Sequence, residues 1–535
     1  MMNINPKDLA MESDTGADRK HWDETIKLIL GGIGTLYSNY FEVFTQQANF
    51  THTWSVFIRY LGNLLTRQSF GVSTTVFHVL SRVLARVGHP ENLGLESREE
   101  VWTLWSTQGV KLVQGVANSG NGIQETLEAY THSYKPLYRL LEPTLTAEIV
   151  QKTLEILREC VLYPDAPPYF QDVDMVTPLQ ASILEVIKLI KTDMPGVPSL
   201  LVRNLSELAT VAFSKSRVTS GGGGGRGARV PTCIAMSIQS INHLETVIVK
   251  HIQDTEVYTT SALATALEAL EIPIGLKYGF ATPANVARGK CPNLWFHATR
   301  TVLAIMKRML PAMDGEELLL DIPDDIRRHI WQAIVKVVGS VLRANTDGLD
   351  VSEATLKQGE ILDMESFGAL RELIIPSLGQ AVVPDDTILH YMEAVFWSSM
   401  LYRVPGMPAG TQEWLTAREH GGSTSELVIE RRSRMAYVCI DELFSLTAVS
   451  SGSGKNDSAE LKRLAEMAAP WLIRRVGLVL SRYVSDQPLR GRMPQPASQR
   501  KEMLYILDQV VRLDSALETV HIDCELHMRV GLNAS

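Results

Sequence analysis

Residues 177–191 read TPLQASILEVIKLIK, and they carry the clearest folding signal in the chain. Thr177 is a residue type that caps helix N-termini, Pro178 suits the first helical position because an N–H there would have no partner, and Gln180 can complete a capping box. The apolar residues that follow recur on one helical face: Ile183, Leu184, Ile187 and Ile190. The stretch therefore predicts an amphipathic helix that buries one side.

Similar segments recur along the chain. Residues 54–67 (WSVFIRYLGNLLTR) and 330–342 (IWQAIVKVVGSVL) show the same helical spacing, and Ser97 with Glu100 predicts a second capping box. Alternating strand patterns with hairpin turns are scarce. Two such segments together take up about 40–47 residues, the length of HEAT or armadillo units, so the chain would hold on the order of 12 helix pairs.

The predicted fold is all-α, an armadillo/HEAT-like α-solenoid of degenerate helical repeats. A single bundle of 535 residues would exceed the usual size of one core, whereas a stack of repeats grows without that limit. The predicted order is a disordered N-terminal tail at 1–20, helical repeats at 21–213, a Gly-rich linker loop at 214–230, helical repeats at 231–447, a Ser/Gly linker at 448–458, C-terminal helices with a basic patch at 459–519, and a loosely ordered tail at 520–535.

The composition argues against several classes of protein. Hydrophobic residues make up 45% and charged residues 21%, as in folded domains rather than disordered chains. The formal net charge of −9 argues against a protein that grips nucleic acid over its whole surface. No apolar run approaches the roughly 18 residues of a membrane span, and the start of the sequence lacks the apolar core of a signal peptide. We therefore expect a cytoplasmic protein whose membrane association is peripheral.

A glycine run at residues 214–232, SKSRVTSGGGGGRGARVPT, raises the question of phosphate binding. A Walker loop needs Lys followed by Ser or Thr after its last glycine, but Arg226 and Gly227 follow the run here. The flanking patterns are helical, so a Rossmann fingerprint does not fit either. Two Arg residues are too few for an RNA-binding Arg–Gly segment. We interpret the run as a loop between helices.

The sequence predicts no catalytic, cofactor-binding or metal-binding residues. The segment HIDCELH at residues 521–527 contains possible metal ligands, yet it lacks the spacing of a zinc site and is interpreted as a solvated terminal turn. The carboxylate pairs Asp324–Asp325 and Asp385–Asp386 each follow a proline, as at helix N-termini. The cysteines lie far apart without a CxxC pair, which predicts reduced thiols: Cys160, Cys233, Cys291, Cys439 and Cys524.

One charge feature stands out in this acidic protein. Between Pro470 and Lys501 there are seven basic residues and one acidic residue, Asp486. The basic residues are Arg474, Arg475, Arg482, Arg490, Arg492, Arg500 and Lys501. Such a run is often a solvated outer helix face. The alternative is a patch for an acidic partner or for anionic lipid headgroups, where each basic residue contributes about 1 kcal/mol.

Several segments resemble the Mon-two (monensin-sensitivity protein two) family. APWLIRRVGLVLSRYVSD at 469–486 and LRGRMPQPASQRKEMLYILDQVVRL at 489–513 resemble the C-terminal region of that family. DVDMVTPLQASILEVI at 172–187, LEALEIPIGLKYGF at 267–280 and LRELIIPSLGQAVVP at 370–384 are also similar to family segments. Together the matches span residues 21–519, and their joint order is more specific than any one of them.

The resemblance implies a helical-repeat scaffold at the trans-Golgi network and endosome membranes. Family members are peripheral membrane proteins related to the large Arf guanine-nucleotide exchange factors. They act with a Dopey-type protein, an Arf-like GTPase and an aminophospholipid flippase in retrograde and vacuolar traffic. The resemblance supplies no catalytic residues, cofactor, nucleic acid or small-molecule substrate. Compared with the family, the sequence corresponds to a C-terminal portion, so we expect it to lack functions of the N-terminal half.

Two other functions stay open beside this non-enzymatic scaffold. An Arf-type guanine-nucleotide exchange factor, or its regulatory portion, would require an exchange domain with a glutamate-bearing loop, and the segment RVPGMPAG at 403–410 does not resemble one. A karyopherin-like soluble transport receptor is also built from helical repeats and would bind Ran-GTP. We predict that the chain is not an enzyme.

Overall fold

The computed structural model describes residues 16–66, 69–115, 123–163, 175–218, 229–280, 293–314, 322–344, 353–402, 404, 406–408, 432–448, 457–485 and 497–517. Within these ranges nearly all regular structure is helical, and the only strands are two residues long. The chain divides into two compact units, Met1–Val211 with Cys233–His243 (unit 1), and Ala212–Thr232 with Leu244–Ser535 (unit 2).

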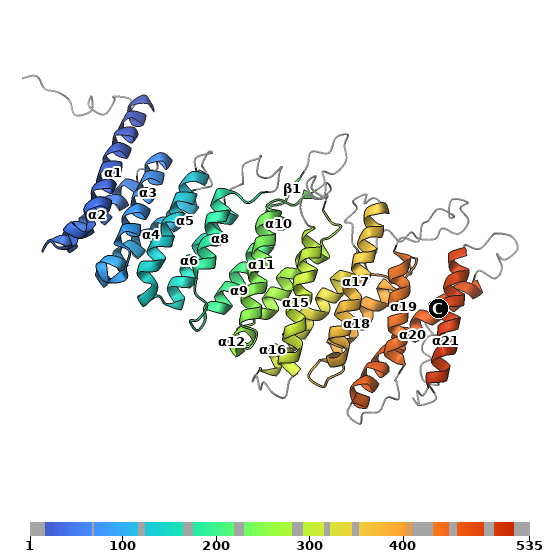
Figure 1. The fold of residues 1–535 in the computed structure, drawn as a ribbon. Coiled ribbons are helices and arrows are strands. Elements are labelled where there is room, and N and C mark those ends of the chain that lie inside the picture. The colour runs from blue at the N-terminus through green and yellow to red at the C-terminus, as the bar shows by residue number, and fades with distance from the viewer. Residues whose placement is uncertain are drawn as a thin grey trace, which may run out of the picture. The chain divides into compact units, whose positions relative to one another are not determined.

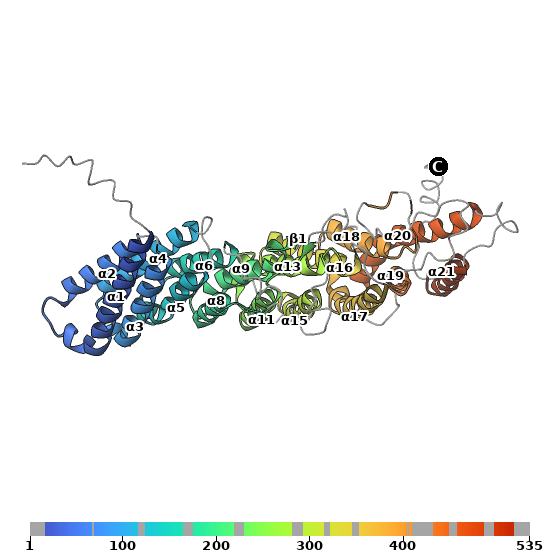
Figure 2. The same ribbon diagram turned by 90° about the horizontal axis from the view of Figure 1, so that it is seen from above.

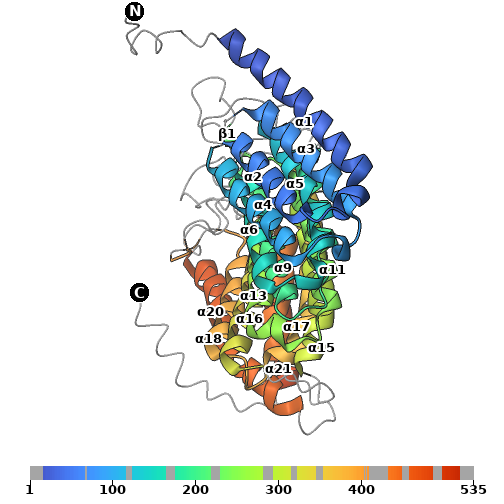
Figure 3. The same ribbon diagram turned by 90° about the vertical axis from the view of Figure 1, so that its left-hand side faces the viewer.

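Unit 1 is a two-layered stack of helices. In one layer α1, α3, α5 and α8 lie side by side in sequence order, and in the other α2, α4, α6 and α9 do the same (Figures 1 and 2). Figure 3 views this stack from its end, with α1, α3 and α5 on one side and α2, α4 and α6 on the other. The helices are α1 Gly16–Thr45, α2 Phe50–Leu65, α3 Phe70–Val87, α4 Leu95–Gly115, α5 Ile123–Leu141, α6 Ala147–Leu162, α8 Pro178–Leu189 and α9 Val197–Ala209, with short 3-10 turns η2 Pro90–Asn92 and η4 Glu142–Thr144.

Unit 2 repeats the same arrangement. One layer contains α13, α16, α18 and α20, and the other contains α15, α17, α19 and α21. Helix α11, Ile234–Lys250, is divided between the two units. The remaining elements are α10 Val211–Ser214, β1 Arg217–Val218, β2 Arg229–Val230, α12 Thr255–Thr259, α13 Ala262–Gly275, α15 Leu294–Asp314, α16 Asp324–Leu342, α17 Glu353–Leu378, α18 Asp385–Ser398, α19 Ser433–Thr447, α20 Asp457–Ser485 and α21 Ala497–Leu517. The predicted all-α helical-repeat solenoid is confirmed.

The helix pairs are longer than the sequence predicts. In unit 1 the pairs begin at Gly16, Phe70, Ile123 and Pro178, so about 54 residues separate one pair from the next, rather than 40–47. The cause is helix length, because α1 has 30 residues and α4 has 21, and these are the lengths that set the period. The described part of the chain therefore holds eight such pairs followed by α21, fewer than the expected 12.

One of the two capping boxes that the sequence predicts is present in the structure. Thr177 and Gln180 form the predicted capping box at α8, and Ile183 and Ile187 are completely buried. The second predicted box is wrong, because α4 begins at Leu95 and Ser97 lies inside it. The Glu100 carboxylate instead accepts a hydrogen bond from Ser55 Oγ of α2, at 2.7 Å. Glu100 therefore pairs with Ser55 of α2 and does not complete a capping box at α4.

Some predicted segment boundaries differ from the structure. Helix α1 begins at Gly16, so residues 16–20 are helical where the sequence predicts the N-terminal tail. The ends of the predicted Gly-rich loop are ordered, since Arg217 pairs with Val230 and Val218 with Arg229 in an antiparallel hairpin. Residues 219–228, most of the 448–458 linker and the 520–535 tail lie outside the described residues. The short hairpin is β-structure that helical periodicity does not reveal.

Candidate functional site

The predicted basic patch contains one residue that does not reach the surface. Arg475 on α20 is completely buried. Its Nε donates to Ser399 Oγ at 2.9 Å, its Nη2 donates to the Ser399 carbonyl at 2.9 Å, and Nη2 also pairs with the buried Glu502 carboxylate. These contacts join α20 to the end of α18 and to α21. Arg475 therefore ties helices together and cannot contact a membrane or a partner.

Other members of the patch lie on aromatic rings. The Arg474 guanidinium is exposed and sits 4.9 Å from the Phe396 ring centre, while Arg482 is half-buried and sits 3.4 Å from that of Tyr402. Lys501 lies 5.4 Å from the Tyr437 ring centre. Arg500 is exposed, and Arg490 and Arg492 lie outside the described residues. Of the described patch residues, Arg474, Arg500 and Lys501 keep an exposed charge.

A second family-like segment, residues 267–280, supplies a buried cation. Lys277 Nζ lies 2.8 Å from Asp363 Oδ1 and 2.6 Å from the Val341 carbonyl, and Arg432 Nη1 lies 2.6 Å from Asp363 Oδ2. All three charged side chains are buried. Burial lowers the pKa of Lys277 to about 8, against the opposing pull of Asp363. The cluster joins α13, α16, α17 and the start of α19, and is structural.

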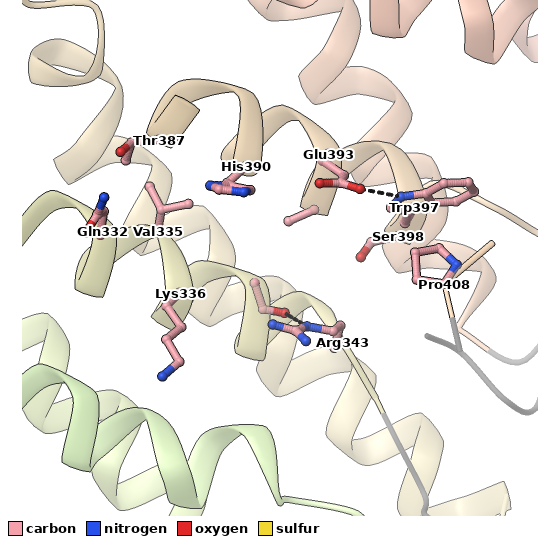
Figure 4. Close-up of a pocket in the computed structure, with 12 residues that line it drawn as sticks. Gln332, Val335, Lys336, Arg343, Thr387, His390, Glu393, Trp397, Ser398 and Pro408 are labelled. Atoms are coloured by element: carbon pink, nitrogen blue, oxygen red, sulfur yellow. Dashed lines mark hydrogen bonds between the residues drawn. The ribbon is translucent and has the colours of Figure 1, made fainter. Parts of the chain in front are cut away.

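A groove lies between α16 and α18 in unit 2 (Figure 4). Its volume is about 470 Å³. Facing residues of the two helices are small here: a Cβ added at Gly339 would lie 3.9 Å from the Cβ of Ala394 and 3.3 Å from Arg343 Nη2. We call this feature the α16–α18 groove.

The polar groups of the α16–α18 groove are mostly cationic or hydrogen-bond donors. Arg343 Nε donates to the Gly339 carbonyl at 3.1 Å. Lys336 lies on the same helix face, 3.8 Å from Glu271 of α13, and His390 lines the α18 side. Among the described lining residues the one carboxylate is Glu393, which accepts a hydrogen bond from Trp397 Nε1 at 3.2 Å.

One donor at the groove has no partner. Ser398 lines the groove and is 2% exposed, and its Oγ makes no hydrogen bond within the described part of the chain. A buried hydroxyl without a partner carries a desolvation cost that a bound acceptor would relieve. A nucleophilic hydroxyl needs an adjacent base, and among the described residues none is hydrogen-bonded to Ser398.

The described residues contain no group of three or more His, Cys, Asp or Glu placed to hold a metal ion. The predicted metal-ligand segment, 521–527, lies outside those residues. None of the helices in the described ranges is long and apolar enough to cross a bilayer.

No sequence motif reveals the α16–α18 groove. Gly339 within an apolar helical run is the one signal that could have pointed to it, because glycine in a helix interior costs about 1 kcal/mol relative to alanine and implies a close approach. The residue that Gly339 faces, Ala394, lies on another helix, and its position follows only from the fold.

Comparisons with known proteins agree with the motif resemblance. No protein-family model matches the chain. Four curated proteins match, all named MON2 or MON2 homolog. Protein MON2 of Saccharomyces cerevisiae is 20% identical over 90% of the chain, the Drosophila melanogaster homolog 20% over 92%, and the Schizosaccharomyces pombe homolog 22% over 68%. The matches cover 29%, 32% and 21% of these relatives, so the chain spans about a third of their length or less. The resemblance to the Mon-two family is confirmed.

Proposed function

Because the chain is similar to MON2 proteins over most of its length, we propose that it is a helical-repeat scaffold in membrane trafficking. One observation carries this proposal: the family-like segments supply the ties between helices. Lys277 lies in one such segment and Arg475 in another, and both are buried ionic contacts that fix the stack. These contacts hold neighbouring helices of unit 2 together, as a stack of repeats that presents a surface to partners requires.

A stack of this kind acts by presenting surfaces to other proteins. By the family resemblance, the partners are a Dopey-type protein, an Arf-like GTPase and a phospholipid flippase, and the process is endosome-to-Golgi and vacuolar transport. The chain would be cytoplasmic and peripheral on trans-Golgi network and endosome membranes. Since the chain spans about a third of its relatives or less, each of these partners is a proposal for this chain.

The exposed members of the basic patch are the part of the chain that we propose faces the membrane. Arg474, Arg500 and Lys501 are the described residues that could approach anionic headgroups, with about 1 kcal/mol expected from each. Reversing Arg500 and Lys501 to Glu should weaken sedimentation with phosphatidylserine vesicles, and reversing Arg308 on α15 should not. Equal sedimentation of all three proteins would mean that the patch is only solvated.

Imaging of the tagged full chain in its native cell tests the proposed function. We expect puncta that overlap trans-Golgi and endosome markers. A steady nuclear-rim signal without such puncta would favour the transport-receptor alternative. In parallel, the purified chain is added to Arf and Arf-like GTPases loaded with fluorescent nucleotide. We expect no stimulation of nucleotide release, and a clear stimulation would overturn the non-enzymatic interpretation.

A further inference from the structure

We infer that the α16–α18 groove is a docking site for an acidic peptide segment of a partner protein. The inference rests on the proposed function, because it names the kind of surface that the scaffold offers. The proposed occupant is a short extended segment with Asp or Glu side chains and an apolar residue beside them.

The shape of the groove suits an extended segment. Helix α16 lines it from Gln332 to Arg343, a length of about 16 Å at 1.5 Å per residue. An extended chain advances about 3.3 Å per residue, so about five residues fit along it. A single phosphate group would fill a small part of the 470 Å³ volume. The groove therefore has room for a peptide backbone as well as for its side chains.

The charge of the groove selects an acidic segment. Of the described lining residues, Lys336 and Arg343 carry positive charges and Glu393, which accepts a hydrogen bond from the Trp397 ring N–H, carries a negative one, so the lining is net positive. Lys336 also lies 3.8 Å from Glu271 of α13. Arg343 presents a planar fork that pairs with a carboxylate in two parallel hydrogen bonds. The protein as a whole carries a formal charge of −9, so a cationic groove is a local exception that attracts acidic segments.

The walls of the groove supply the apolar part of the contact. Val335 and Ala394 line it on facing helices, and Trp397 and Pro408 close one end (Figure 4). Tryptophan is enriched where partner side chains anchor. Cations beside an apolar wall favour a peptide over a lipid headgroup, which needs its cations at an open surface.

The test begins with a random 12-residue peptide library displayed on phage and selected on the immobilised full chain. The selection is repeated on the Ala394→Leu variant, in which the new side chain fills the groove and every charge stays. We expect peptides enriched in Asp or Glu next to an apolar residue, recovered on the native chain and lost on Ala394→Leu. Failure to enrich acidic peptides, or equal recovery on both proteins, would overturn the inference.

The enriched peptide is then synthesised with a fluorescent label, and its affinity is measured by anisotropy. Lys336→Glu combined with Arg343→Glu should weaken binding about tenfold or more, and added salt should weaken binding to the native chain. The matched control is Arg308→Glu, an exposed arginine on α15 outside the groove, which should change the affinity less than about twofold. Unchanged binding in the double variant would contradict the assignment.

Two further measurements distinguish a loss of binding from a loss of folding, and a peptide site from a lipid site. Circular dichroism of each variant must match the native chain, and Ala394→Leu and the double variant perturb the fold in different ways. If both variants instead lose binding to phosphatidylserine vesicles and not to peptides, the groove is a lipid site and the inference is wrong. These measurements use purified protein, so a negative result leaves the imaging test of the proposed function untouched.

Discussion

Units 1 and 2 are built from the same two-layered stack, yet their helices are held together by different chemistry. In unit 1 aromatic side chains fill the interior between α4 and α5. The Trp105 and Tyr130 rings stack with centres 4.5 Å apart, Trp105 Nε1 donates to the Tyr130 carbonyl at 3.2 Å, and Tyr130 Oη donates to the Trp105 carbonyl at 3.1 Å. The ion pairs described in unit 1, such as Arg158 with Glu207, lie at the surface.

In unit 2 the corresponding contacts between helices are buried charges. Asp363 pairs with both Lys277 and Arg432, and Arg475 pairs with Glu502. Removing one member of a buried pair leaves the other without a partner at a cost of about 3–5 kcal/mol, whereas an exposed pair contributes about 0–1 kcal/mol. A helical stack can therefore be held together by ring packing or by charge pairing. Where buried charges pair, the loss of one polar residue leaves the other charge buried without a partner.

The largest expected effect is at Asp363, since its removal leaves two buried cations unpaired. Asp363→Ala should lower the free energy of unfolding by at least about 3–5 kcal/mol. Urea unfolding followed by circular dichroism measures this loss, and hydrogen exchange with mass spectrometry should locate it in α13 and α17. The control, Glu466→Ala, removes an exposed i,i+4 pair with Lys462 and should cost about 0.5 kcal/mol. Equal effects at the two sites would contradict the comparison.

The next effect separates two adjacent arginines on α20. Arg475→Met leaves the Glu502 carboxylate buried and unpaired, so we expect a loss of about 3–5 kcal/mol. Arg474→Met removes an exposed cation from the Phe396 ring and should cost about 0.5–1 kcal/mol. Thermal unfolding of the two variants measures the difference. If Arg474→Met were the more damaging change, the assignment of buried and exposed arginine would be wrong.

A smaller effect tests the aromatic packing of unit 1. A Cβ added at Gly109 would lie 1.9 Å from Tyr130 Oη, so Gly109→Ala should overpack the interior and cost about 1–3 kcal/mol. The matched change in unit 2 is Gly368→Ala on α17, where a Cβ meets no atom within 4 Å. That change should stabilise the helix by about 0.5–1 kcal/mol. Urea midpoints that move in the same direction for both variants would show that the unit 1 interior is looser than described.

The last expected effect is a pH dependence in unit 2. Burial lowers the pKa of Lys277 from 10.5 to about 8, so above 10.5 this site is neutral in both folded and unfolded chains. As the pH falls from 10.5 to 8, Lys277 binds a proton in the unfolded chain but not in the folded chain. The free energy of unfolding therefore decreases through this window. Relative to Lys277→Met, the native chain should become less stable through that window and change little below it. A flat or reversed difference in urea midpoints between pH 8 and 10.5 would contradict this.

The sequence predicts the parts of this fold that depend on local chemistry. Periodicity identifies the buried faces: Trp54 of the 54–67 segment and Trp331 of the 330–342 segment are completely buried, and Asp324 and Asp385 lie in the first turns of α16 and α18. Periodicity places residues on a helix face but does not say which face meets another helix. The burial of Arg475 depends on Glu502, which lies 27 residues away on α21.

The same limit applies to the site. The basic run from Pro470 to Lys501 is visible in the sequence, but the cations of the α16–α18 groove are too sparse to stand out. Lys336 lies in α16 and Arg343 directly follows that helix, seven residues later. Their place beside one cavity follows from the packing of α16 against α18.

The most direct test of the scaffold interpretation is affinity purification of the tagged full chain from its native cell, with quantitative mass spectrometry of what is retained. We expect a Dopey-type protein among the retained partners, at levels that Arg308→Glu leaves unchanged. Retention of Ran and nuclear-pore proteins in place of trafficking proteins would contradict it.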